Sequence, residues 1–208
     1  MFRNMFYLLQ MAQVGSHGDD MTNSTIQALA FVGSLRVASY NQALLRAAIE
    51  RSPRELEMDV FDLARVPFYN ADLEADGDPD SVSALKRKIH ASDLVFIVTP
   101  EYNQGMSAVT KNMIDWASRP PRPQAWDGKP IAIMGTTPGP LGTAAAQRAL
   151  RECLSSNNAR VMPQPRLLLG GANSLFDQDL KLVNEAAMER LEKFMSAAIE
   201  WARLFQRS

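Results

Sequence analysis

The run DLVFIVTPEYN, residues 93–103, carries the strongest structural signal in this sequence. Its first part, Asp93–Thr99, is apolar almost without interruption, which is typical of a strand buried on both faces of a parallel sheet. The run then changes abruptly into PEYN, residues 100–103, and a polar, aromatic loop in this position is typical of a binding site. The stretch therefore predicts a buried strand whose carboxyl end opens on a site.

Similar apolar runs alternate with helical patterns along the rest of the chain. Pro163 and Pro165 make the last strand an edge strand or an irregular one, because proline has no amide to donate. Pro79 with Asp80 or Ser81 is expected to open the second helix. We expect strands at Ile26–Val32, Leu56–Leu63, Asp93–Thr99, Pro130–Gly135 and within Ala159–Leu169, helices at about Ser39–Arg51, Asp80–His90, Ser107–Ala117, Thr143–Ser155 and Asp177–Phe205, and a loop at Val66–Pro79.

This alternation predicts an α/β fold, a three-layer doubly wound five-stranded parallel sheet. Its simplest strand order is the flavodoxin-like order 2-1-3-4-5. In such a sheet the ligand binds beyond the carboxyl ends of the strands, at the switch point between strands one and three. Polar motifs should therefore follow strands one, three and four, and they do.

Length and composition exclude several classes of protein. A chain of 208 residues with 46% apolar and 22% charged residues predicts one main domain, residues 26–208, and excludes a disordered or fibrous protein. The formal net charge of -1 gives no electrostatic reason to expect nucleic acid or a membrane as the partner. Cys153 is the single cysteine, so no disulfide is expected, and we interpret it as core or interface packing.

The first 25 residues do not share the pattern of the rest. Met5–Ala12 is apolar but far too short to span a bilayer. Arg3 before this run weakly resembles a secretory signal, although no convincing cleavage site follows. We interpret residues 1–25 as a flexible N-terminal extension, with Met21 as an alternative start, and expect a cytoplasmic protein.

Two features invite a metal-binding interpretation, but no metal site is expected. His90 ends a predicted helix, where an imidazolium suits the helix dipole, so we interpret it as structural. An acidic loop precedes that helix, and its spacing does not match the EF-hand pattern. A solvated loop is the simpler interpretation of its carboxylates, which are Asp72, Glu74, Asp76, Asp78 and Asp80.

The loop after the first strand reads GSLRVASYN, residues 33–41. It matches neither the GxGxxG dinucleotide fingerprint nor the GxxxxGK[ST] phosphate loop. Free amides at the start of the following helix attract a phosphate, and Arg36 could add a charged contact. Alternatively, Ser39 is only an N-cap and Arg36 only a surface charge. This loop alone leaves both interpretations open.

Two further loops favour a binding site at the same end of the sheet. In the loop Thr99–Gly105, an aromatic ring and exposed amides could hold a planar heterocycle. The loop Gly135–Thr143 contains three glycines, which allow the backbone to approach a ligand closely. Each loop could be a plain turn, but three polar loops at one end of a sheet favour a site.

Four motifs together carry a family resemblance: GSLRxxSxN after strand one, TPEYN after strand three, KNMIDWASR at residues 111–119, and the Pro/Gly loop followed by AQR at residues 146–148. The chain resembles the NADPH-dependent FMN reductase family, most closely its soluble branch of quinone, chromate and ferric reductases. The likeness runs from about Ile26 to Trp201. Thr143, where many members have a second glycine, and Gln104, where others carry Tyr, His or Arg, depart from the pattern.

The resemblance implies a cofactor site built from the three loops. The first loop would hold the FMN phosphate through Ser34, Arg36, Ser39 and Asn41, with Tyr40 beside them. The second loop would line the isoalloxazine and the ribityl chain through Pro100, Glu101, Tyr102 and Asn103. The third loop would close the other side through Thr136, Thr137 and Gly142.

The implied activity is hydride transfer from NADPH or NADH to flavin N5, followed by delivery of two electrons to a small acceptor such as a quinone, with ping-pong kinetics. The flavin is the reactive group, so no catalytic side chain is expected. The resemblance also implies a homodimer or homotetramer joined through the helices after strands three and four. The alternatives are a non-enzymatic flavodoxin-like electron carrier, a class that is typically strongly acidic, and a flavin-binding regulatory protein.

Overall fold

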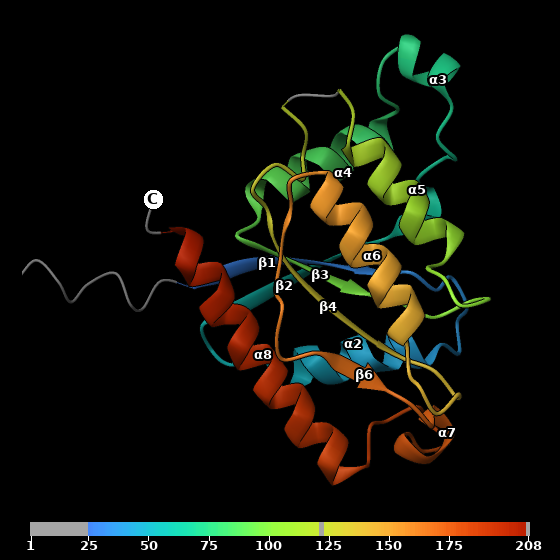
Figure 1. The fold of residues 1–208 in the computed structure, drawn as a ribbon, viewed down its shortest axis with the longest axis vertical. Helices are drawn as coiled ribbons and strands as arrows, with labels where there is room; N and C mark the ends of the chain where they lie inside the picture. The colour runs from blue at the N-terminus through green and yellow to red at the C-terminus, as the bar shows by residue number, and fades with distance from the viewer. Residues whose placement is uncertain (1–24, 121–122, 207–208) are drawn as a thin grey trace, which may run out of the picture.

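The computed structural model describes residues 25–120 and 123–206. Their strands form a parallel sheet in the order β2-β1-β3-β4-β5, with β6 paired to the last residues of β4 (Figure 1). The predicted order 2-1-3-4-5 is therefore confirmed. The strands are β1 (Ile26–Val32), β2 (Leu56–Phe61), β3 (Leu94–Val98), β4 (Pro130–Thr136), β5 (Arg160–Val161) and β6 (Leu167–Leu169).

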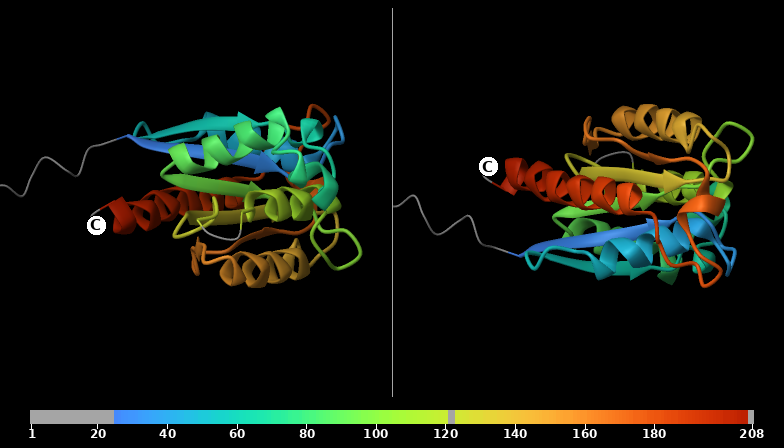
Figure 2. Two further views of the ribbon diagram at one scale, coloured as in Figure 1. Left: turned by 90° about the horizontal axis from the view of Figure 1, so that it is seen from above. Right: turned by 90° about the horizontal axis from the view of Figure 1, so that it is seen from below.

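Helices cover both faces of this sheet. Figure 1 shows α4, α5 and α6 on one side of the strands and α2 and α8 on the other, and Figure 2 shows the first layer in front of the strands when seen from above and the second when seen from below. The predicted three-layer, doubly wound architecture is confirmed. The helices are α2 (Tyr40–Glu50), α3 (Ala71–Ala75), α4 (Asp80–Ala91), α5 (Ala108–Ala117), α6 (Ala144–Ser156), α7 (Ala172–Leu175) and α8 (Glu185–Gln206), with a 3-10 turn η1 (Leu63–Arg65).

The position of β3 explains why its sequence is apolar throughout. Leu94, Phe96 and Val98 pack into the core that includes α2 and α8. Val95 and Ile97 pack into the core on the opposite face, with α4, α5 and α6. All five side chains are completely buried, and burying each stabilises the fold by about 1.5–3 kcal/mol. The strand is thus a rigid base for the loop that follows it.

The fifth predicted strand differs from expectation, because it is divided in two. Both parts pair with β4: β5 lies beside Pro130 and Ile131, and β6 lies beside the last residues of β4. Pro163 and Pro165 occupy the segment between them, where proline cannot donate to a ladder. The prolines predicted the irregularity, but not the division into two separate strands.

The end of the second strand and the loop after it also need correction. The strand ends at Phe61, and the side chain of Asp62 caps η1 by accepting the amide of Ala64 at 2.9 Å. The predicted loop 66–79 contains the short helix α3, which Asn70 caps through the amide of Asp72 at 2.9 Å. Such local side-chain caps compete with extended backbone, and they decide these boundaries.

The start of the last helix and the capping of α4 differ from the prediction. The last helix begins at Glu185, because Phe176 and Leu182 pair across a turn that holds Leu180 at φ 57°. A residue with that backbone angle cannot continue a right-handed helix. Helix α4 begins at Asp80 after Pro79 as expected, but no side chain caps it, so the predicted capping bond is not formed.

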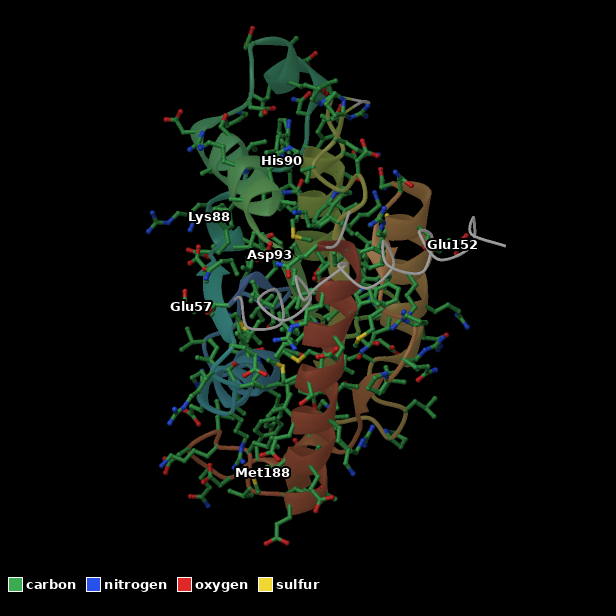
Figure 3. The ribbon with its side chains drawn as sticks, turned by 90° about the vertical axis from the view of Figure 1, so that its left-hand side faces the viewer. Glu57, Lys88, His90, Asp93, Glu152 and Met188 are labelled. Atoms are coloured by element: carbon green, nitrogen blue, oxygen red, sulfur yellow. The ribbon has the colours of Figure 1, made fainter. Side chains whose placement is uncertain are left out.

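His90 and the acidic loop lie away from the cavity described below. Figure 3 shows His90 near the carboxyl end of α4, where the side chain is exposed in a basic last turn. Within residues 25–120 and 123–206, no group of acidic, histidine or cysteine side chains is placed to hold a metal ion, and no helix is long and apolar enough to cross a membrane. The predicted extension falls almost entirely outside the described residues.

Candidate functional site

A cavity of about 350 Å³ opens at the carboxyl ends of β1, β3 and β4. This volume lies within the range of about 300–1,000 Å³ that small-molecule sites occupy. Pro138, which the sequence analysis did not select, also lines it, whereas Asn103 and Gly142 do not. The predicted residues that do line it come from all three loops: Ser34, Arg36, Ser39, Tyr40, Asn41, Pro100, Glu101, Tyr102, Thr136 and Thr137.

The first loop is held tightly against the second. A Cβ atom on Gly33 would lie 2.2 Å from Oγ1 of Thr110 and 3.0 Å from Cδ of Pro100, so only glycine permits this approach. Ser39 caps α2, because its Oγ accepts the amides of Asn41 at 3.2 Å and Gln42 at 3.5 Å. The N-cap interpretation of Ser39 is therefore correct, and its hydroxyl also lines the cavity.

The rest of the first loop offers unused donors. No described residue accepts a hydrogen bond from the backbone amides of residues 34–38. Arg36 is exposed and pairs with no carboxylate in the described part of the chain. Unpaired amides beside a free guanidinium at a helix N-terminus form an environment that favours an anion.

Asn41 has a different set of partners from the one the sequence suggested. It is buried, its Nδ2 donates to the carbonyl of Thr136 at 3.0 Å, and its Oδ1 accepts the amide of the same residue at 3.0 Å. The carboxamide thus pairs with the end of β4 as a neighbouring strand would. This connects the first and third loops and fixes one wall of the cavity.

Tyr40 also faces a neighbouring segment. Its hydroxyl donates to Oδ1 of Asn173 at 2.9 Å, and its ring packs against Phe176 with centroids 5.4 Å apart. The side chain therefore joins the start of α2 to α7. Tyr40 lines the cavity with part of its side chain, but its hydroxyl is already hydrogen-bonded to Asn173.

The second loop forms a tight hairpin turn. The amide and carbonyl of Tyr102 both bond to Gly105, at 3.0 Å each. The two central residues, Asn103 and Gln104, have φ angles of 50° and 61°, as a type I′ turn requires. Asn103 does not line the cavity, whereas Tyr102 does: it is half exposed, and its hydroxyl lies 3.5 Å from Oγ of Ser34.

Glu101 reaches across the site to the third loop. Its Oε2 accepts the amides of Ala145 at 2.8 Å and Ala146 at 3.0 Å, at the start of α6. Pro100, which precedes it, is buried against the first loop. The negative charge of Glu101 therefore lies at the positive end of the α6 dipole.

The third loop is fixed by bonds to the segment after β6. Oγ1 of Thr136 and the amide of Thr137 both donate to the carbonyl of Leu169, each at 3.0 Å. Gly142 has φ 60°, and a Cβ there would lie 3.0 Å from the carbonyl carbon of Leu168. Gly142 therefore allows the loop to pack on β6, outside the cavity lining.

Comparison with known proteins identifies the family. The family described as NADPH-dependent FMN reductase matches residues 26–174. The chain belongs to the NADPH-dependent FMN reductase family. It is 39% identical to the NAD(P)H-dependent FMN reductase of Pseudomonas aeruginosa over 178 residues, covering 86% of this chain and 96% of the relative.

Two further relatives agree with this assignment. A quinone reductase of Pseudomonas putida is 38% identical over 173 residues, which cover 83% of this chain and 92% of that protein. The solved structure of FerB, a flavoenzyme NAD(P)H:(acceptor) oxidoreductase from Paracoccus denitrificans, has a TM-score of 0.79 and 35% identity, covering 86% of this chain and 97% of FerB. The resemblance expected from the sequence motifs is confirmed.

The residues around the cavity of this family member fit FMN. The unpaired amides of residues 34–38 and the unpaired Arg36 suit a phosphate. Pro100, Tyr102 and Pro138 line the same cavity with uncharged, partly aromatic surface that suits a planar ring. Apart from Arg36, the charged side chain in this lining is Glu101, which already bonds to α6.

The block KNMIDWASR, residues 111–119, covers the last seven residues of α5 and the two that follow, and it holds a neighbouring segment in place. Asn112 donates to the carbonyl of Pro67 at 2.9 Å and accepts the amide of Tyr69 at 2.7 Å, and Trp116 donates to the same carbonyl at 2.8 Å. The hydrogen bond from the Tyr69 hydroxyl to Glu74 raises the pKa of Tyr69. In the reductase this block is thus a clamp for residues 67–69.

Cys153 packs partly buried in the core with α4, α5 and α6, as the sequence analysis predicted. Burial raises the pKa of its thiol. A buried thiol of this kind is a poor nucleophile and lies apart from the residues that line the cavity.

Proposed function

We propose that this protein is an NAD(P)H-dependent FMN oxidoreductase that passes electrons from NAD(P)H through FMN to quinones or other small acceptors. The observation that carries the proposal is the cavity at the switch point of the sheet, where an anion-binding loop and an uncharged wall meet in a member of this family. The names of the relatives from the two Pseudomonas species support flavin reduction and quinone reduction.

Within this proposal, the protein binds and orients the cofactor. The phosphate is held by Ser34, Arg36 and Ser39 together with the free amides of residues 34–38, and the ring and ribityl chain lie against Pro100, Tyr102 and Thr137. The chemistry that FMN supplies when bound is acceptance of a hydride from NAD(P)H at N5 and delivery of two electrons to a second substrate. Tyr40, Asn41 and Glu101 support the walls through their bonds to neighbouring segments.

The surroundings of the cavity favour flat, largely apolar acceptors. Leu35 is 54% exposed and Leu141 is 78% exposed, and both lie in loops that form the cavity. Tyr102 adds an aromatic face that is 52% exposed. NAD(P)H and the acceptor then use the same opening in turn. Initial rates with both substrates varied should give parallel double-reciprocal lines, and intersecting lines would reject this ping-pong order.

The assembly and location follow from the resemblance and belong to the same proposal. We expect a homodimer or homotetramer that uses α5 and α6, the helices after β3 and β4. Light scattering after gel filtration measures this directly. A cytoplasmic location is expected because the cytoplasm supplies NAD(P)H, and cell fractionation tests it.

The experiment that tests the activity is an absorbance titration of the purified protein reconstituted with FMN. Flavin bands should bleach when NADPH or NADH is added without oxygen, and should return when a quinone is added. Bound flavin that stays oxidised in the presence of both nicotinamides would favour an electron carrier or a flavin-binding regulatory protein. Failure to bind FMN at all would overturn the proposal.

A further inference from the structure

We propose that Glu101 is a positioning residue, which caps α6 from a different loop and thereby sets the distance between two walls of the cavity. The sequence resemblance implied that this side chain lines the flavin. The structure gives its carboxylate another task, because the bonding oxygen lies 2.8 Å and 3.0 Å from two amides of α6. Only the expected effect on FMN binding rests on the proposed function.

The amides that Glu101 accepts are the ones a helix cap normally satisfies. Thr143 is the N-cap residue of α6, so Ala145 and Ala146 are the second and third residues of the helix. An N-cap side chain accepts the amide of one of these two positions. Glu101 lies 44 and 45 residues away in sequence and accepts both.

Thr143 does not perform this task, although threonine is a favourable N-cap residue. No side-chain capping bond is formed at the start of α6. Instead, Oγ1 of Thr143 accepts a hydrogen bond from Nε2 of Gln147 at 3.1 Å, and Thr143 is completely buried. It packs against Gly135, where a Cβ would lie 2.6 Å from Oγ1 of Thr143. Without Glu101, the two amides would lose their partner.

Charge strengthens this bond. No ion pair joins Glu101 to a cation in the described part of the chain, so its carboxylate faces the helix dipole alone. A carboxylate that accepts two backbone amides forms hydrogen bonds about twice as strong as neutral ones. A glutamine at this position keeps an acceptor oxygen of the same reach but removes the charge. Glu101→Gln and Glu101→Ala therefore separate charge from capping.

The bond has a geometric consequence for the site. Glu101 directly precedes the Tyr102 hairpin, and the start of α6 directly follows the third loop. The capping bond therefore ties the Tyr102 wall to the Thr137–Pro138 wall, as Asn41 ties the first loop to β4. Removing it should loosen the cavity without removing a contact to the ligand.

Amide hydrogen exchange of the FMN-free protein tests the cap directly. In Glu101→Ala, the amides of Ala145 and Ala146 should exchange about tenfold faster, the scale expected for loss of a helix cap. In Glu101→Gln they should stay within about threefold of the wild type, since an acceptor remains. The matched control is Glu152→Ala, an exposed residue of α6 that Figure 3 shows at the molecular surface, and it should leave both amides unchanged.

FMN affinity, measured by quenching of flavin fluorescence, supplies the second measurement. Glu101→Ala should weaken binding about tenfold, and Glu101→Gln less than threefold. Unchanged exchange at Ala145 and Ala146 in both variants would overturn the proposal. So would a Glu101→Gln protein that loses FMN while both amides stay protected, because the carboxylate would then contact the ligand. If Glu101→Ala does not fold, Glu101→Leu, which keeps the bulk of the side chain without an acceptor, is measured in its place: faster exchange at Ala145 and Ala146 supports the cap, and unchanged exchange overturns it. Failure of the wild type to bind FMN would reject the proposed function and leave the exchange result standing.

Discussion

The guanidinium of Arg36 lines the cavity without a carboxylate partner in the described part of the chain. In this it differs from Arg51, which pairs with Glu192 at 2.8 Å, and from Arg203, which pairs with Glu200 at 2.8 Å. A cation left unpaired beside free backbone amides is available to an anionic ligand. The sequence left open whether Arg36 is a phosphate ligand or a surface charge, and its surroundings favour the first interpretation.

This leads to a prediction about FMN affinity. Arg36→Ala should weaken FMN binding by about 1.5–3 kcal/mol, roughly 10- to 150-fold in Kd, because one charged hydrogen-bonding group is lost. Fluorescence quenching measures the change. Riboflavin, which lacks the phosphate, should bind wild type and variant equally.

The matched control for this prediction is Arg65→Ala. Arg65 is also an exposed arginine at this end of the sheet, but it lies near Asp62, at 3.6 Å, and does not line the cavity. Its removal should leave the Kd for FMN within about twofold, because surface ion pairs contribute little. If the two substitutions weakened FMN binding equally, the overall charge of the protein, and not a contact from Arg36, would determine the affinity.

At the scale of elements, the hairpin after β3 stores backbone strain beside the cavity. Gln104 has φ 61° and is exposed, so its side chain has no packing that would offset the cost of a left-handed backbone. Glycine adopts this angle without strain. The preceding Asn103, at φ 50°, is a residue type that tolerates it better.

Gln104→Gly should therefore stabilise the protein by about 1 kcal/mol, which corresponds to a rise of roughly 2–4 °C in Tm for a chain of this size. Thermal unfolding followed by circular dichroism measures this. The control is Gln178→Gly, in an exposed turn where φ is not positive, and it should lower stability slightly. A loss of stability in both variants would mean that the hairpin does not hold Gln104 in a strained conformation.

Some element boundaries could be predicted from the local sequence pattern, and others could not. β1 and the start of α4 lie where the apolar period and Pro79 place them. The late start of α8 could not be read in this way, because the turn at Leu180 depends on pairing between Phe176 and Leu182. A leucine gives no local signal for a positive φ angle.

At the scale of the whole molecule, the cavity joins loops from three strands, so a ligand there should stabilise the entire domain. FMN at one hundred times its Kd should raise the free energy of unfolding by about 2.7 kcal/mol, and Tm by roughly 5–11 °C. Differential scanning calorimetry at several FMN concentrations tests this. A Tm independent of FMN would show that the cavity does not bind it in the native state.

The arrangement of the sheet was readable from the chain alone. Continuous apolar runs such as Leu94–Val98 identify strands buried on both faces, and short segments between strands and helices permit few topologies. The three loops at the carboxyl end follow from that order, which is why Ser34, Tyr102 and Thr137 were predicted to lie together and do line one cavity. Local periodicity is sufficient here, because the spacing of apolar side chains along the chain indicates which face of each strand and helix packs into the core.

The partners of particular side chains depend on the folded structure. Asn41 bonds to Thr136, 95 residues away, and Glu101 bonds to Ala145, 44 residues away. Nothing in the composition of either loop marks these polar side chains as structural supports, because a ligand-binding residue and a buried capping residue are chosen from the same residue types. Which of the two tasks a carboxylate or carboxamide performs is decided by which backbone amides and carbonyls the packed loops bring within hydrogen-bonding distance.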